Sequence, residues 1–361
     1  MYDKDMSTIV IEKYDYIDSL RGIAIIGVIL WHLHLLWLTT PKIFTIWMMW
    51  VPLFFIISAF TLCLTYHKRK NLETSPNIRF YIRRFFRIVP VFVTLTILVF
   101  ITMRSIDIGI SFDGSMINLL AHISFMYWFS QQYIGSMMMG ERSLFNEVIF
   151  YMFFPAIFLY IVKSNKKILL FAIITFVICY LYNIFWNSIL GLNKSYLYTT
   201  PLTHFFSFSL WFILFMLRDF TPPKIYTHIL YIVNIIGFII LGYIHIFYGM
   251  YLFPFFIINL ALLVFLCARG GIYTLLTNKV NSYIGKISYS MYLINMSLFT
   301  VVWYIARTYA GRENMILYHR IVWVIALSLL IGLSSISYYI LEIPSISLGR
   351  KYLQKLDTAS L

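Results

Sequence analysis

Asp18, Arg21 and His32 are the first residues along the chain whose types and spacing suggest chemistry. Asp18 and Arg21 are three residues apart, as an ion pair on one helical face would be. An unbroken apolar run follows and carries His32, eleven residues after Arg21. In an α-helix this spacing is close to three full turns, so both side chains lie on nearly one face, roughly 16 Å apart along the axis. Ionisable groups inside an apolar span usually mark a reaction centre or a pathway, although a histidine that only hydrogen-bonds to a neighbouring helix is the plainer alternative.

A carboxylate, Glu147, lies inside another apolar run. We expect it about one turn below the outer end of that span, with Ser143 one turn above it on the same face. A carboxylate at this depth must be protonated, paired or in contact with water. We expect Glu147 to be the only acid clearly inside a span, because the other thirteen fall in loops or at span ends. It is therefore either a functional group or a buried residue that joins helices by hydrogen bonds.

The stretch 66–87 is strongly basic, with seven Lys and Arg residues and one acid. Arg83, Arg84 and Arg87 gather where the next apolar run begins, and Arg84 and Arg87 are spaced as neighbours on one helical face. Guanidinium groups bind phosphates through paired hydrogen bonds. The cluster therefore predicts a phosphate site, with a topology anchor that contacts lipid head groups as the alternative.

The elements that position these residues must be membrane helices. The chain has 361 residues, of which 61% are hydrophobic and only 12% charged, against about a quarter charged in soluble domains. The apolar runs are long and continuous, which excludes a β-barrel. We predict an all-α, polytopic transmembrane helical bundle that forms a single domain over residues 1–361. The runs long enough to cross a bilayer are 22–39, 45–65, 88–104, 144–162, 168–186, 200–217, 225–242, 247–267, 287–306 and 317–341.

The basic residues set the expected orientation. An eleventh, shorter run at 115–130 is left uncrossed, as a re-entrant or interfacial helix on the outer face. With both termini in the cytosol, 21 of the 28 Lys and Arg residues are then cytosolic, as the positive-inside rule requires. If 115–130 crossed, every later segment would invert. The net charge of +14 is thus explained by about ten spans, and no nucleic-acid partner is predicted.

Neither a metal nor a tightly bound cofactor is predicted. The three cysteines lie in apolar runs, and none of His34, His122, His204, His245 and His319 has a metal-site partner three or four residues away. We expect His122, His204, His245 and His319 at the membrane interface. The chain also lacks a glycine-rich phosphate loop, a nucleophile elbow and a dinucleotide fingerprint.

Six short motifs together resemble those of the acyltransferase-3 family of integral membrane acyltransferases. They are D-S-L-R-G at 18–22 with His32, F-F-I-I-S-A-F at 54–60, R-R-F-F-R-I-V-P at 83–90, S-L-F-N-E-V-I-F-Y at 143–151, Y-I-G-K-I-S-Y-S-M-Y-L at 283–293 and L-E-I-P at 341–344. Each is weak alone, but their order and spacing over nearly the whole chain are specific. The chain departs from the family at Ala59, Arg142 and Asn295, where the family often has Gly, Trp and His. Asn295 excludes a second catalytic histidine at that point.

The resemblance implies acyl transfer, usually of acetyl, from cytosolic acyl-CoA to a hydroxyl of an extracytoplasmic glycan or glycolipid. Acetyl-CoA would be a co-substrate, and the protein would lie in the bacterial cytoplasmic (inner) membrane among its lipids, as a stand-alone enzyme that modifies O-antigen or another surface polysaccharide. The expected catalytic residues are His32 and Glu147. The expected acyl-CoA ligands are Arg21, Arg83, Arg84 and Arg87, and the expected acceptor or supporting residues are Asp18, Ser143, Asn146 and Tyr151.

Several alternatives stay open at this point. His32 could act as general base or accept the acyl group itself, and Glu147 could orient His32 or bind the sugar. The donor could carry succinyl or a longer acyl group, and the acceptor could be a lipid or a small molecule. A transporter without chemistry is the rival from another class. It would predict paired, interrupted hydrophobic segments in two halves of the chain, which the sequence does not show.

Overall fold

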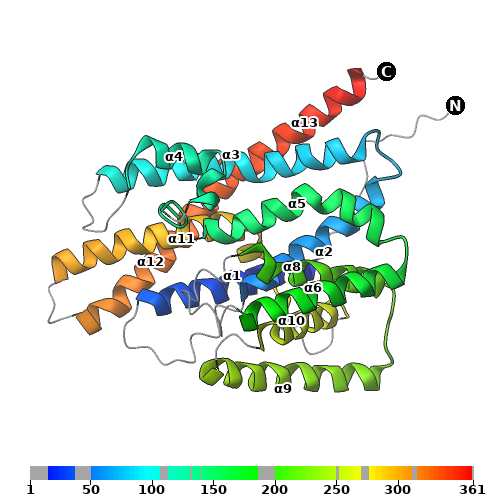
Figure 1. Cartoon of the computed structure of the whole chain (residues 1–361). Helices are drawn as coiled ribbons and strands as arrows, with labels where there is room; N and C mark the ends of the chain where they lie inside the picture. The colour runs from blue at the N-terminus through cyan, green and yellow to red at the C-terminus, as the bar shows by residue number, and fades with distance from the viewer. Residues whose placement is uncertain are drawn as a thin grey trace.

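A computed structural model of the chain consists of helices packed side by side (Figure 1). It describes residues 15–36, 50–105, 113–130, 132–138, 140–185, 200–248, 252–269, 276–310 and 315–359, and no strand occurs among them. The helices are α1 (Asp15–Leu36), α2 (Val51–Arg69), α3 (Pro76–Ser105), α4 (Met116–Ile123), η2 (Met126–Phe129), α5 (Glu141–Ile161), α6 (Asn165–Phe185), α8 (Pro201–Met216), α9 (Lys224–Tyr248), α10 (Phe253–Cys267), α11 (Lys279–Ala310), α12 (Met315–Ser337), η6 (Tyr338–Glu342) and α13 (Ile343–Ala359).

The predicted all-α polytopic bundle is confirmed. Eight stretches of the described helices are long and apolar enough to cross a membrane, and α8 and α10 are shorter apolar helices. The count of ten spans and the cytosolic position of the termini stay predictions. Parts of the predicted spans, at 37–39, 45–49, 186 and 249–251, lie outside the described residues.

The segment predicted to remain uncrossed folds into two short helices, α4 and η2. The eight residues of α4 span about 12 Å, whereas a bilayer core is about 30 Å thick. Helix α4 packs against α3, so the chain turns back along that helix after the end that we predict to face outward (Figure 1).

Helices α1 and α11 run parallel and in register, in the most extensive helix pairing of the bundle. Near their first turns, a Cβ added to Gly285 would lie 3.1 Å from the backbone nitrogen of Gly22. Further along, His32 contacts Asn295. Both pairs are 263 residues apart. This parallel direction agrees with the predicted order, in which seven spans separate the two helices, whereas a crossing at 115–130 would reverse α11.

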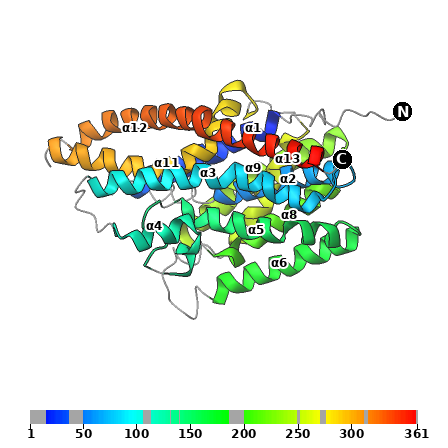
Figure 2. The ribbon, with the colours of Figure 1, turned by 90° about the horizontal axis from the view of Figure 1, so that it is seen from above.

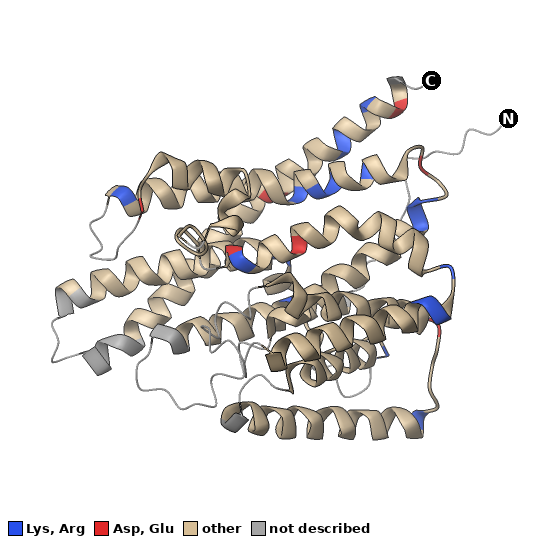
Figure 3. Ribbon diagram, viewed as in Figure 1, with Lys and Arg blue, Asp and Glu red and all other residues tan. Residues whose placement is uncertain are grey.

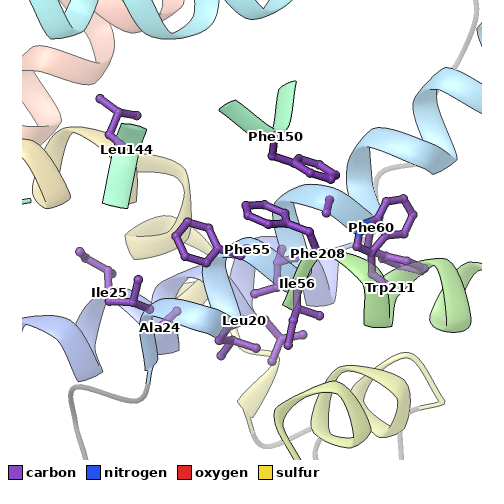
Figure 4. Close-up of a cluster of buried hydrophobic side chains, with 14 of the residues drawn as sticks. Leu20, Ala24, Ile25, Phe55, Ile56, Phe60, Leu144, Phe150, Phe208 and Trp211 are labelled. Atoms are coloured by element: carbon purple, nitrogen blue, oxygen red, sulfur yellow. The ribbon is translucent and has the colours of Figure 1, made fainter. Parts of the chain in front are cut away.

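An aromatic core lies among α2, α5 and α8 (Figure 4). The rings of Phe150 and Phe208 stack with centroids 4.0 Å apart, and Phe55 lies 4.8 Å from Phe208. Stacked and tilted ring pairs such as these stabilise a core beyond the area that they bury. This packing fixes the faces of α2 and α5 that carry the site residues described below.

Basic residues gather at one end of the bundle (Figure 3). That end carries the connections between α2 and α3, α5 and α6, and α8 and α9, together with the described end of α13 (Figures 1 and 3). We predict this end to be cytosolic. Helices α3 and α13 run side by side there, as Figures 1 and 2 both show.

One expectation about the spans is wrong. Glu342 is fully buried in η6, a π-helical turn inside the continuous helix formed by α12, η6 and α13. Glu147 is therefore not the only acid inside a span. The L-E-I-P motif contains Glu342, but the fall in hydropathy after it suggests a span end, although the helix continues through α13.

Candidate active site

Five helices meet around a cavity of about 200 Å³, which we call the central cavity. Helices α1, α2, α3, α5 and α11 each contribute polar side chains to its wall. These are Arg21, Ser58, Thr61, Arg84, Arg87, Ser143, Glu147, Tyr151, Ser288, Tyr289 and Tyr292. Six of the residues predicted from the sequence, which lie between positions 21 and 151, are thus brought together from three helices, α1, α3 and α5.

The α5 wall of the central cavity is a row of residues one turn apart. Ser143, Glu147 and Tyr151 share a helical face because their spacing is four. The Tyr151 hydroxyl donates a hydrogen bond to the Glu147 carboxylate. Ser143 contacts the Tyr292 hydroxyl and donates to the carbonyl of Gly140 at 3.2 Å. The contact between Ser143 and Tyr292, in which either hydroxyl can donate, joins α5 to α11.

The arginines of the central cavity have carboxylates beside them. Arg21 lies 3.4 Å from Asp18, and it also donates to the Thr61 hydroxyl at 3.4 Å. Arg87 lies 3.4 Å from Glu342. The Arg84 guanidinium stands over the Tyr151 ring, 5.6 Å from its centroid, next to the tyrosine that donates to Glu147.

Three arginines and three carboxylates therefore make the charges around the central cavity balance. The acids are Asp18, Glu147 and Glu342, of which Glu147 lines the cavity. Since an unpaired charge is costly inside a membrane bundle, this balance lets the site exist without a bound anion. Glu342 is a member that the sequence interpretation missed.

A second, larger cavity of about 800 Å³ lies between α2, α3 and α13, and we call it the basic cavity. Its described lining holds two acids, Glu73 and Asp357. Six arginines line it, namely Arg69, Arg79, Arg83, Arg84, Arg87 and Arg350. Arg84 and Arg87 line both cavities, so these two side chains stand between them.

The predicted acyl-CoA residues are divided between the two cavities. Arg83 belongs to the basic cavity alone, where its guanidinium forms two hydrogen bonds with Glu73, of 2.8 and 2.9 Å. Arg21 belongs to the central cavity alone. Arg79 and Arg350 were not predicted as acyl-CoA ligands. Helix α13, which carries Arg350 and Asp357, is far from α3 in the sequence and meets it only in the folded bundle, where Asp357 pairs with Arg79.

His32 lies on α1, buried, and outside the lining of the central cavity. Its Nδ1 is 2.5 Å from the Oδ1 of Asn295. Asn295 in turn donates to the carbonyl of Tyr292 at 2.8 Å, and Tyr292 lines the cavity. The contact that orients the imidazole therefore comes from Asn295. The sequence offered orientation of His32 as one of two roles for Glu147, but the Glu147 carboxylate accepts a hydrogen bond from Tyr151.

Two other predicted residues lie at the edge of the site. Asp18 does not line the central cavity and acts on it through Arg21. Asn146 is buried beside Glu147 on α5 but is not part of the cavity wall. In the described part of the chain no group of three or more His, Cys, Asp and Glu side chains is placed to hold a metal ion.

A buried hydrogen-bond network joins the segment α4–η2 to the start of α5. His122 Nε2 lies 2.9 Å from Glu141, and both side chains are fully buried. The Tyr127 hydroxyl donates to the Glu141 carbonyl at 2.7 Å, and burial raises the pKa of that phenol well above its usual value. His122 and His204 are both buried within the bundle, and their expected position at the depth of the membrane interface stays a prediction.

Fold and site together define a multi-pass membrane protein with a charged cavity between its helices beside a basic cavity. A comparison with models of protein families matches residues 14–341 to the acyltransferase-3 family, whose model describes an acyltransferase domain. Because the match covers most of the 361 residues, the chain belongs to this family and is a membrane acyltransferase. No curated protein and no solved structure matches the chain.

Proposed function

We propose that the protein transfers an acetyl group from cytosolic acetyl-CoA to a hydroxyl of a surface glycan, such as O-antigen, on the outer face of a bacterial cytoplasmic membrane. The observation that carries this proposal is the pair Arg84 and Arg87, which lines both cavities. A donor with phosphates at one end and a reactive acyl group at the other needs two adjoining compartments of this kind.

The charges of the basic cavity suit the nucleotide end of coenzyme A. Four arginines that line this cavity alone, Arg69, Arg79, Arg83 and Arg350, face two acids in its described lining, and Arg84 and Arg87 add guanidinium groups from the border with the central cavity. The phosphates of coenzyme A carry roughly four negative charges at neutral pH. Arginine forks bind such groups through paired hydrogen bonds. The central cavity, in contrast, is balanced by its own carboxylates, so we assign it to the uncharged thioester and not to the phosphates.

The size of the central cavity favours a short acyl group. A cavity of about 150 Å³ in another protein holds one benzene molecule, and the central cavity measures about 200 Å³. An acetyl group and the adjoining part of the pantetheine arm fit a space of this order, whereas a long acyl chain would extend beyond it. Succinyl is small enough to remain a candidate.

The proposed chemistry uses His32 as general base; this residue does not line the central cavity but is linked to it through Asn295 and Tyr292. His32 removes the proton of the acceptor hydroxyl, whose oxygen attacks the thioester carbon. The carbon–sulfur bond then breaks, and the leaving thiolate of coenzyme A takes the proton from the imidazolium. Glu147 binds a sugar hydroxyl from the α5 wall. A positioned general base contributes about 10²- to 10⁴-fold to a rate.

The test is transfer of labelled acetyl from acetyl-CoA by membranes that contain the protein, with alkali-labile acetyl on the glycan as product. We expect His32→Ala to lower the rate at least 10²-fold and Arg84→Gln to raise the KM for acetyl-CoA. The matched controls are His228→Ala, an exposed histidine of α9, and Arg104→Gln, an exposed arginine at the other end of α3.

Two outcomes would overturn parts of the proposal. Full acetylation by His32→Ala would remove this residue from the chemistry. A wild-type protein that transfers succinyl but not acetyl, or that acetylates only a lipid or a small molecule, would refute the donor or the acceptor named here.

A further inference from the structure

We propose that Asn295 holds His32 in the tautomer that carries its proton on Nδ1, which leaves the Nε2 lone pair free to receive the acceptor's proton. Asn295 is thus a positioning residue for a histidine that the proposed function makes catalytic, and the inference rests on that function. Its basis is the hydrogen bonding of one amide side chain.

The orientation of the Asn295 amide is fixed by its own helix. Its Nδ2 lies 2.9 Å from the carbonyl oxygen of Met291 and 2.8 Å from that of Tyr292. Carbonyl oxygens only accept hydrogen bonds, so the amide group that faces them must be the NH₂. The opposite orientation would place Oδ1 against two carbonyl oxygens and is excluded by repulsion. Oδ1 therefore faces His32.

The tautomer of His32 follows from this orientation. The amide oxygen of Asn295 is an acceptor, and His32 Nδ1 lies 2.5 Å from it. Two acceptors cannot share a hydrogen bond, so Nδ1 must carry the hydrogen. In the neutral ring the other nitrogen, Nε2, then has the free lone pair, which is the form that a general base requires.

The amide of Asn295 can hold the correct histidine tautomer, although an amide in the corresponding position of a serine-protease triad does not. In a serine-protease triad, replacing the aspartate by asparagine costs about 10⁴-fold, because the amide stabilises the wrong histidine tautomer. The NH₂ group of Asn295 cannot turn toward His32 without losing both helical carbonyls. The neutral amide also adds no charge to a site whose arginines and carboxylates already balance.

The direct test is ¹⁵N NMR of the ring nitrogens in protein labelled at histidine and reconstituted in lipid. The His32 signals are assigned as those lost in His32→Gln. We expect a protonated Nδ1 and an unprotonated Nε2 in the wild type, and a mixture of tautomers in Asn295→Leu, which has a similar volume but no acceptor. A wild-type His32 protonated on Nε2 would overturn the proposal without any measurement of activity.

Kinetics supply a second readout. Asn295→Leu should lower kcat about 10- to 100-fold and leave the KM for acetyl-CoA unchanged, because an interaction made for the chemical step is lost and donor binding is not. The control is Asn234→Leu, which removes a buried amide between α9 and α10 and should keep kcat per folded molecule. An unchanged kcat in Asn295→Leu would refute the positioning role.

The two proposals fail in different ways. A wild-type protein with the expected tautomer but no transfer from any acyl-CoA would refute the proposed function and support the hydrogen-bond assignment. A protein that transfers acetyl with His32 protonated on Nε2 would support the proposed function and refute the hydrogen-bond assignment.

Discussion

Gly285→Ala should disable the enzyme through backbone contact alone. A Cβ at this position would lie 1.7 Å from the carbonyl oxygen of Asp18 and 2.6 Å from its carbonyl carbon. Both atoms belong to the backbone of α1, so no side-chain rotation relieves the overlap.

The displacement can be worked out from these distances. A carbon and a carbonyl oxygen approach to about 3.3 Å without repulsion, so α1 and α11 must separate by roughly 1.6 Å at this point. Overpacking of this kind usually costs about 1–3 kcal/mol of stability. Because Asp18 holds Arg21, the charged wall of the central cavity moves too, and a displacement of about 1 Å can cost a factor of about 10² in rate.

The assay is acetyl transfer at matched amounts of folded protein, together with the melting temperature in detergent. Gly332→Ala is the control, because nothing lies within 4 Å of a Cβ at that position of α12. It should keep full activity and gain up to about 1 kcal/mol from helix propensity. If Gly285→Ala kept wild-type activity and melting temperature, the close parallel packing of α1 and α11 would be refuted.

Two further predictions concern the ion pairs that flank the cavities. Glu342→Gln leaves Arg87 without its carboxylate, so it should lower the melting temperature. In Glu342→Gln/Arg87→Gln the effects should be non-additive, with a coupling energy of about 0.5–3 kcal/mol; additive effects would contradict the pairing. Asp357→Asn releases α13 from Arg79 and should raise the KM for acetyl-CoA several-fold, whereas Asp219→Asn, at an exposed pair, should not. Exchanging the charges, with Arg79→Asp and Asp357→Arg, should restore donor binding, and a failure to do so would refute a role for the pair itself.

The sequence predicts best what helical periodicity determines. The four-residue spacing of Ser143, Glu147 and Tyr151 places them on one face, and the structure shows that face toward the central cavity. Arg84 and Arg87 are three apart and line the cavities together. The helical bundle itself follows from the long apolar runs, because in lipid such a segment can form the hydrogen bonds of its backbone only as a helix.

What the sequence does not predict depends on contacts between helices far apart in the chain. Asn295 contacts His32 only because α11 packs on α1, and Arg350 lines the basic cavity only because α13 packs on α3. Hydropathy cannot predict that Glu342 is buried inside a helix. A buried carboxylate that pairs with an arginine lowers the local hydropathy in the same way as the end of a span. Arg83, by contrast, belongs to the predicted cluster, yet its helical position turns it toward Glu73 and the basic cavity.

The shared register of α1 and α11 connects the two ends of the site. Gly22 and Gly285 lie at one end of the pairing, and His32 and Asn295 lie ten residues further along both helices, about 15 Å away. A Cβ added at Gly285 must therefore either separate the two helices along this length or tilt them about the contact between His32 and Asn295. Separation would break the His32–Asn295 hydrogen bond and lower kcat, whereas tilting would disturb mainly Arg21 and raise KM. Gly285→Ala combined with the ¹⁵N measurement distinguishes these responses, because only separation gives the tautomer mixture expected of Asn295→Leu.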